Sequence, residues 1–327
     1  MVALAPAGVA LLLMPLLLPP WYLIELCYAL LYAIACLGLN LLFGTTGLLS
    51  LGHAAYFGAA AYTGGFLYYF GPVGSLEAFL LAGVVGSAAL AAVLGFLCVR
   101  AVRIQFTILT LAFTQMVHAL FITGAAFRPF GSLGKGLYFL YEGGLYLPRL
   151  TIVGIDFSPD EFIPALYYVI LAAFLLSTWT LWRISRSPFG MALRAIRDNE
   201  TRAALVGLPL RRYRWYAFII SGVFVGLAGG LWGQLDRQIT PEQLNWLFSA
   251  RLVLATVLGG TRHFAGPVVG AFAFVTLHDI ALRWTEHREV VLGLLLIAVV
   301  FAFPAGLAGS ASHLLDRARR LRRAGSR

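Results

Sequence analysis

Long apolar runs recur along nearly the whole chain, and they constrain its fold more than any other feature. An α-helix needs about 20 apolar residues to cross the hydrocarbon core of a bilayer. Hydrophobic residues make up 60% of the 327 residues and charged residues only 12%, so polar side chains are too few to cover a water-facing surface. A β-barrel would show alternating segments of about ten residues instead. The sequence therefore predicts an all-α, polytopic transmembrane helical bundle.

Polar and helix-breaking residues divide the chain into ten predicted spans. Pro19-Pro20 and Gly71-Pro72 mark two of the breaks, because proline cannot continue a helix. The first span has no basic segment before it and no clear cleavage site, so we interpret it as a retained helix rather than a signal peptide. The spans are about 1–18, 21–43, 48–70, 76–99, 104–123, 162–183, 215–235, 244–260 and 264–282, with a tenth that follows Glu289 and runs to about 308.

Basic residues predict the orientation of these spans. The net charge is +10, and 17 of the 24 basic residues fall on one side if residues 100–103, 183–214, Arg262 and the C-terminal tail lie together. Such an excess marks the cytoplasmic side, and an even number of spans then places both termini in the cytoplasm. The basic charge is thus explained by topology and the lipid bilayer, and nucleic acid is not expected as a partner.

This orientation gives a simple domain plan. We expect one transmembrane domain over residues 1–310, followed by a basic cytoplasmic tail at 311–327. A long glycine-rich stretch at 124–161 forms an extracytoplasmic loop, and residues 184–214 form a cytoplasmic loop.

The cytoplasmic loop carries the start and stop signals of two short helices. Ser187-Pro188 opens the first, because serine caps a helix and proline fits its first position. Asn199-Glu200 opens the second, and Gly207 supplies a left-handed stop. Helical periodicity places Ala192, Ala195 and Ile196 on one face of the first helix. The pair is either a docking surface for a partner or a positively charged loop held by lipid headgroups.

Two glycine-rich breaks interrupt the apolar runs. The first, residues 44–58, holds His53 among glycines and hydroxyl groups, and the second, residues 258–271, also joins a glycine turn to a histidine and a small-residue helix. Broken helices mark the substrate path in many transporters, whereas small residues also serve close helix packing, and both interpretations stay open. The candidate path residues are Asn40, Ser50, His53, Tyr56, Gly259 and Gly260.

Signatures of an enzyme are absent from the sequence. There is no HExxH, GxSxG or CxxC motif, and the three cysteines lie in apolar runs. Gly134-Lys135 lacks the rest of a phosphate-binding P-loop, because Gly136 stands where Ser or Thr belongs. We therefore expect no catalytic residue, cofactor or metal site. If transport is driven by ATP, another polypeptide must bind and hydrolyse the ATP.

Four blocks of sequence, in order, resemble one transporter family. They are residues 38–62 around LSLGHAAYFG, the segment RSPFGMALRAIRDNETRAALVGL at 186–208, residues 257–271 around LGG and GPVVGA, and FPAGL at 303–307. Together they resemble permeases of branched-chain amino-acid ABC importers, LivM type. The resemblance covers about residues 30–310.

The resemblance implies partners and a coupling role. It implies a second homologous permease subunit, two ABC ATPase subunits that dock on the cytoplasmic loops, and an extracytoplasmic substrate-binding protein that delivers a small-molecule substrate. The coupling pattern survives loosely in Glu200, Ala203, Ala204 and Gly207, to which the first helix adds Ser187, Gly190 and Ala195. The family's outer-loop motif is altered to GSLGKGL at 131–137, which weakens the prediction of a substrate.

The leading hypothesis is a permease subunit, without its own ATPase site, of an importer for branched-chain or other hydrophobic amino acids in the cytoplasmic (inner) membrane. Relatives of this type also serve urea, short amides and aromatic acids. A stand-alone transporter driven by an ion gradient is the alternative from another class. It requires ionisable residues paired at the membrane midplane, and these are scarce.

Overall fold

A computed structural model describes residues 19–71, 74–101, 104–130 and 144–284, with residues 11, 12, 14, 15 and 134 and a few positions between 290 and 310. Most of the predicted first and tenth spans, the altered motif at 131–137 and the basic tail lie outside the described residues. Within them, eight helices have 14 residues or more: α2 (Pro20–Thr46), α3 (His53–Phe70), α4 (Leu76–Cys98), α5 (Ile104–Ile122), α7 (Pro159–Arg186), α10 (Leu210–Asp236), α11 (Trp246–Gly259) and α12 (Gly266–Trp284).

These helices match the second to ninth predicted spans in order and confirm the all-α bundle. Five of the described helices, α2, α4, α5, α7 and α10, are long and apolar enough to cross a membrane. The other three are shorter or less apolar, and two of them, α3 and α12, begin within the glycine-rich breaks.

Two predicted boundaries are wrong, each for a local reason. The third span does not start at residue 48, because α2 runs to Thr46 and Leu48–Gly52 stays outside any helix before α3 starts at His53. The seventh span starts at Leu210 rather than 215, so Arg211, Arg212 and Arg214 lie on a helix rather than in a loop. Arginine is a strong helix former, and Pro209 marks the start.

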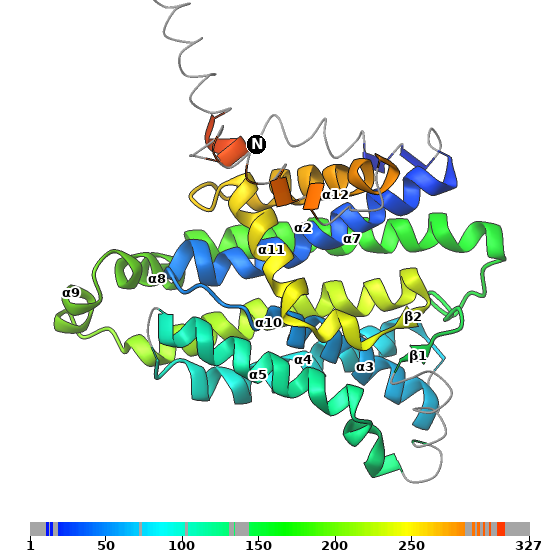
Figure 1. Ribbon diagram of the computed structural model, residues 1–327, viewed down its shortest axis with the longest axis horizontal. Helices are drawn as coiled ribbons and strands as arrows, with labels where there is room; N and C mark the ends of the chain where they lie inside the picture. Colours follow the sequence, from blue (N-terminus) through cyan, green and yellow to red (C-terminus); the bar gives the residue numbers. More distant parts are fainter. Residues whose placement is uncertain are drawn as a thin grey trace, which may run out of the picture.

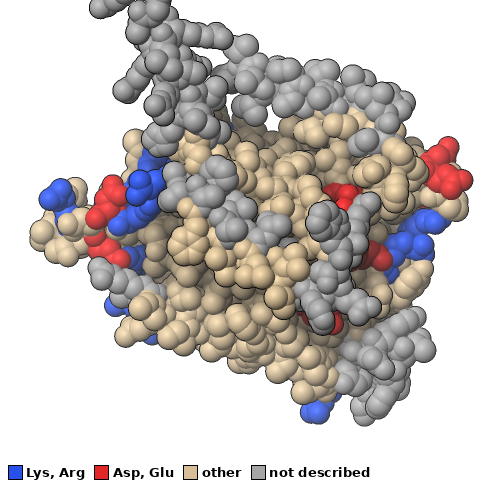
Figure 2. Space-filling view, turned by 45° about the horizontal axis from the view of Figure 1, so that its top comes forward, with Lys and Arg blue, Asp and Glu red and all other residues tan. Residues whose placement is uncertain are grey.

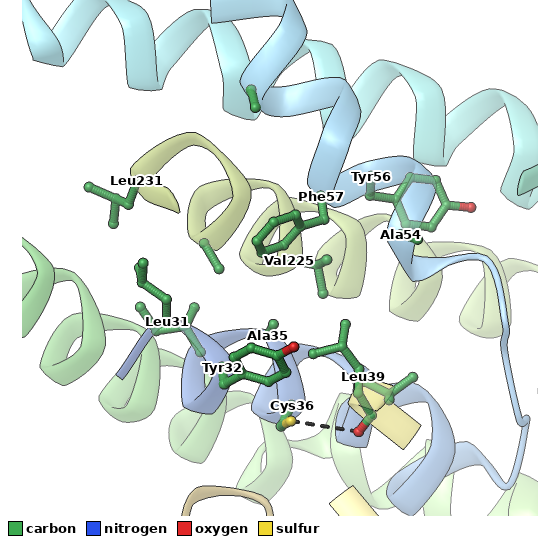
Figure 3. Close-up of a cluster of buried hydrophobic side chains, with 14 of the residues drawn as sticks. Leu31, Tyr32, Ala35, Cys36, Leu39, Ala54, Tyr56, Phe57, Val225 and Leu231 are labelled. Carbon is green, nitrogen blue, oxygen red and sulfur yellow. Dashed lines mark hydrogen bonds between the residues drawn. The ribbon is translucent and has the colours of Figure 1, made fainter. Parts of the chain in front are cut away.

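Helices α2 and α10 form the centre of the bundle (Figure 1). Helix α2 packs against α7, α10, α11 and α12, and α10 packs against α2, α3 and α4. Figure 3 shows the core where they meet: Leu31, Ala35 and Leu39 of α2 lie on the side of that helix that faces α10, while Cys36 points to the other side. The Cys36 thiol donates to the Leu252 carbonyl of α11 at 3.6 Å.

Glycines let α10 approach its neighbours closely. A Cβ on Gly229 would lie 2.0 Å from the Phe57 carbonyl oxygen, and one on Gly226 would lie 2.0 Å from Ser87 Oγ. Small residues at helix contacts bring backbones together where apolar burial from water cannot drive association, as in a lipid bilayer.

The two ends of the bundle differ. One end carries the short helices α8 (Pro188–Asp198) and α9 (Glu200–Leu205). The other carries the 3₁₀ turn η1 (Ala125–Phe130) and a two-stranded sheet, while a second 3₁₀ turn, η2 (Pro241–Leu244), packs against α3 and α5. In this sheet β1 (Leu145–Tyr146) pairs antiparallel with β2 (Gln238–Ile239), and Leu145 lies opposite Ile239. Figure 2 shows charged side chains gathered at the α8–α9 end and at the opposite end, with largely uncharged surface between them.

Candidate functional site

Helix α8 begins as its sequence predicts. Ser187 is its N-cap, the Ser187 hydroxyl accepts from the Gly190 N–H at 3.3 Å, and Pro188 takes the first helical position. The same hydroxyl donates to the Ile184 carbonyl at 2.7 Å, so it closes the end of α7 as well. A Cβ on Gly190 would lie 2.4 Å from the Ser185 carbonyl oxygen, so only glycine fits at this sharp corner.

The inner face of α8 is packed into its own chain. Leu193 and Ile196 are fully buried, and α8 contacts α2, α7 and α10. Phe189 stacks on Tyr213 of α10, with ring centroids 5.5 Å apart. The predicted partner face of Ala192, Ala195 and Ile196 is therefore divided: Ile196 faces the bundle and Ala195 is exposed. The bundle itself takes the side of that predicted face on which Ile196 lies.

Helix α9 projects from the bundle (Figure 1). Asn199 caps it, and its side-chain oxygen accepts from the Arg202 N–H at 2.9 Å. Glu200 forms an ion pair with Arg214 on the first turns of α10. Of the six residues of α9 only Ala203 is buried, and Ala204 is exposed. The helix ends before Gly207, whose φ of 87° is left-handed as predicted.

The exposed side of α9 ends in two large apolar residues. Leu205 is 84% exposed and Val206 79% exposed, although they are part of an ordered turn in which the Leu208 N–H donates to the Ala203 carbonyl at 3.1 Å. We call Leu205 and Val206 the α9 tip.

Arg197, on the last turn of α8, connects the helix pair to the first glycine break. One guanidinium nitrogen of Arg197 donates to the Gly44 carbonyl near the end of α2. Its aliphatic stem lies over Gly47, where an added Cβ would be 3.1 Å from Arg197 Cγ. A cation at a helix C-terminus also complements the helix dipole.

The two glycine-rich breaks meet at this point. A Cβ on Gly44 would lie 2.7 Å from the Thr261 carbonyl oxygen in the turn between α11 and α12. Across that turn, a Cβ on Gly259 would lie 1.8 Å from the Gly266 carbonyl oxygen. Gly306, from later in the chain, packs on the turn, since a Cβ there would lie 2.4 Å from Gly260 Cα. Segments from the first, third and fourth blocks of the family resemblance thus touch backbone to backbone.

The candidate path residues lie in the interior of the single chain. His53, Ser50 and Tyr56 are each at most 1% exposed, and Asn40 is 8% exposed. His53 Nε2 lies 2.7 Å from Ser221 Oγ, and the Ser221 hydroxyl donates to the Gly38 carbonyl at 2.6 Å, which joins α3, α10 and α2. This geometry is what the packing interpretation expects, and a place for these residues along a path stays a prediction.

Comparison with known proteins identifies the family. The model of the branched-chain amino acid transport system / permease component family matches residues 22–300. The chain belongs to this permease family. The match starts in the first turn of α2 and includes α3 to α12, and therefore the whole α8–α9 site. As a member of it, the chain is a multi-pass permease subunit of an ATP-binding-cassette transporter.

Individual relatives agree with this family. The permease is 30% identical to the high-affinity branched-chain amino acid transport system permease proteins LivM of Salmonella typhimurium and Escherichia coli, over 84% of this chain and 67% of theirs. It is 29% identical to the autoinducer 2 import system permease protein LsrC of Klebsiella pneumoniae, over 52% of each chain. A putative metal-chelate type ABC transporter in an inward-facing conformation aligns at a TM-score of 0.44 and 14% identity, over 85% of this chain and 86% of that one.

Sequence analysis of this permease missed two arginines of the site. Arg214 is 3% exposed on α10, and the sequence offered only Glu200, fourteen positions earlier, as its counter-charge. The partner of Arg197 is a backbone carbonyl, which no side-chain pattern reveals. The cluster at the opposite end was missed too, where Asp236 accepts from Tyr28 and from Trp232 Nε1, the latter at 2.6 Å.

Proposed function

We propose that this permease subunit imports branched-chain or other hydrophobic amino acids, and that separate ATPase subunits supply the energy by docking on α8 and α9. The match to the LivM proteins at 30% identity over 84% of the chain supports the substrate class. The autoinducer relative shows that permeases of similar sequence are named for other solutes, so the substrate needs its own test.

The observation that carries the docking proposal is the α9 tip. Leu205 and Val206 are among the most exposed large apolar residues of the described chain, and they lie at the end of a helix that projects among arginines. Large apolar side chains exposed on an ordered, polar segment are typical of a protein contact. The tip therefore suits an apolar groove on an ATPase.

We place the α8–α9 end in the cytoplasm. The arginines of α7, α8, α9 and the start of α10 gather there, as the positive-inside rule expects. Arg183 lies over Trp179 at 5.8 Å and Arg186 over Trp182 at 4.5 Å, and such aromatic residues favour the membrane–water interface. This orientation keeps residues 124–161 outside, residues 184–214 and the tail at 311–327 inside, and both termini cytoplasmic around one domain at 1–310.

The complete importer in this proposal contains two permease chains, two ATPases and an extracytoplasmic binding protein. Closure of the ATPases moves α8 and α9 and shifts the permease between outward-facing and inward-facing states. Ser187, Gly190 and Gly207 shape the helix pair, Glu200 and Ala203 attach it to the bundle, and Ala195 and Ala204 line its exposed side. Asn40, Ser50, His53, Tyr56, Gly259 and Gly260 are placed along helices that must separate for a path to open.

The docking proposal is tested with the double variant Leu205→Asp/Val206→Asp. We expect the amount of ATPase that co-purifies with the permease to fall by about tenfold or more, because two charges replace the apolar contact. Val153→Asp is the matched control, since Val153 is also 79% exposed but lies outside α8 and α9. Unchanged ATPase recovery in the double variant would exclude docking through the α9 tip.

The substrate proposal is tested by uptake into proteoliposomes that contain the whole importer. Labelled leucine should accumulate only when ATP reaches the ATPases, and unlabelled isoleucine and valine should compete. Competition by urea, short amides or aromatic acids instead would reassign the substrate. Leucine uptake by this chain alone, driven by an ion gradient, would support the ion-coupled alternative.

A further inference from the structure

In the described part of the chain, one side-chain hydrogen bond joins α8 to the end of α2, and Arg197 donates it to the Gly44 carbonyl. The buried side chains of α8 are apolar, and apolar contacts such as those to α2, α7 and α10 are non-directional. A directional bond from a charged guanidinium to a carbonyl is less tolerant of sliding. A shift of α8 must therefore either break this bond or move Gly44 with it.

The backbone at the far end of this bond lies where α2 ends. Helix α2 ends at Thr46, Gly47 has a φ of 75°, and residues 48–52 are outside any helix. The carbonyls of Leu42 and Phe43 accept from the N–H groups of Leu48 and Gly47 at 3.3 and 3.1 Å. The Gly44 carbonyl accepts from Arg197 instead, so the arginine takes part in ending the helix.

The same point touches the second glycine break. Gly44 contacts the Thr261 carbonyl, and Gly260, with a φ of 100°, is in turn covered by Gly306. Backbone-to-backbone contacts of this kind leave no flexible side chain to absorb a displacement. Movement at Gly44 is therefore passed to the turn between α11 and α12.

We propose that Arg197 is the positioning residue that transmits movement of α8 and α9 to the junction of the two glycine breaks. The inference rests on the proposed docking of ATPases at α9. It assigns the step that follows docking, in which movement passes from α8 and α9 to the membrane helices. Arg197 connects α8 and α9 to Gly44 and Gly47 at the end of α2. Gly44 in turn contacts the turn between α11 and α12, so the connection reaches these two helices. Without Arg197 the ATPases still bind and hydrolyse ATP, but their movement reaches the membrane helices poorly.

The test uses three variants of the complete importer in proteoliposomes. Arg197→Met keeps an unbranched stem over Gly47 and removes the hydrogen bond, whereas Arg197→Lys keeps a cationic donor. Arg194→Met is the matched control, because Arg194 is also an exposed arginine of α8, one turn earlier, whereas the described bond to Gly44 comes from Arg197. The measurements are ATPase co-purification, ATP hydrolysis, and substrate imported per ATP hydrolysed.

With Arg197→Met we expect normal co-purification and hydrolysis, and about a tenfold fall in substrate imported per ATP, a size typical of a lost coupling interaction. Arg197→Lys should restore most of the ratio, and Arg194→Met should leave it unchanged. An unchanged ratio in Arg197→Met overturns the inference. Loss of ATPase from that variant also overturns it, since Arg197 would then serve docking. Failure of the unaltered importer to bind any ATPase contradicts the proposed function instead.

A distance measurement separates transmission from a general structural defect. Spin labels are placed on cysteines introduced at Thr201 of α9 or at Arg262, both exposed. Each is paired with a label at exposed Leu176 of α7, and the three native cysteines are buried. In the unaltered importer, nucleotide should change both distances. In Arg197→Met only the Thr201 distance should change, and a nucleotide-dependent change at Arg262 equal to that of the unaltered importer contradicts the inference.

Discussion

Helices α8 and α9 are neighbours with the same start signal, yet they have opposite relations to the bundle. Each begins at a capping side chain, Ser187 for α8 and Asn199 for α9. Helix α8 buries Leu193 and Ile196 completely, whereas α9 buries only Ala203 and exposes Leu205 and Val206. The comparison shows that capping fixes where a helix begins, while the surrounding bundle decides which side chains remain available to a partner.

The largest expected effect on stability comes from a substitution on the buried inner face of α8. Leu193→Ala should lower the free energy of unfolding by about 2–5 kcal/mol, because the substitution leaves a cavity in a packed interior. Leu205→Ala, at an 84% exposed position, should stay within about 0.5 kcal/mol. Thermal unfolding of both variants in the same detergent measures the difference. Equal effects would show that α9 is as integral to the fold as α8.

A smaller effect is expected where α9 is held to α10. Glu200→Gln removes the counter-charge of the buried Arg214, and we expect a local loss of about 1–3 kcal/mol. Hydrogen exchange should show faster exchange of the amides from 199 to 208 and little change in α8. Asp198→Asn, an exposed carboxylate on the last turn of α8, is the control. Faster exchange throughout α8 would contradict the separation of the two helices.

The smallest effect concerns the two caps. Ser187→Ala should cost about 1 kcal/mol of global stability, because the corner between α7 and α8 loses a bond at each side. Asn199→Ala should mainly fray α9 and leave the unfolding temperature nearly unchanged. The two variants are compared by thermal unfolding and by circular dichroism at a fixed temperature, and a larger shift for Asn199→Ala would reverse the expected order.

Local structure was largely predictable from the sequence, and the arrangement of the site was not. Apolar length located the described spans, and Ser187, Asn199 and Gly207 located the ends of α8 and α9, because these signals act within a few residues. The buried face of α8 depends on which helices pack against it, so periodicity alone paired Ala195 with Ile196. The junction of Gly44 with Thr261 joins positions 217 apart, which no local rule connects.

The crowding of glycines between α11 and α12 has a consequence for genetics. A Cβ on Gly259, Gly266 or Gly270 would lie within about 2 Å of a backbone oxygen. Even a substitution to alanine therefore forces the main chain to move at each of these three positions. A genetic screen for loss of function should therefore find many substitutions at these positions. Their cause would be steric clash between two backbone segments, so the cluster would not indicate that the solute passes nearby.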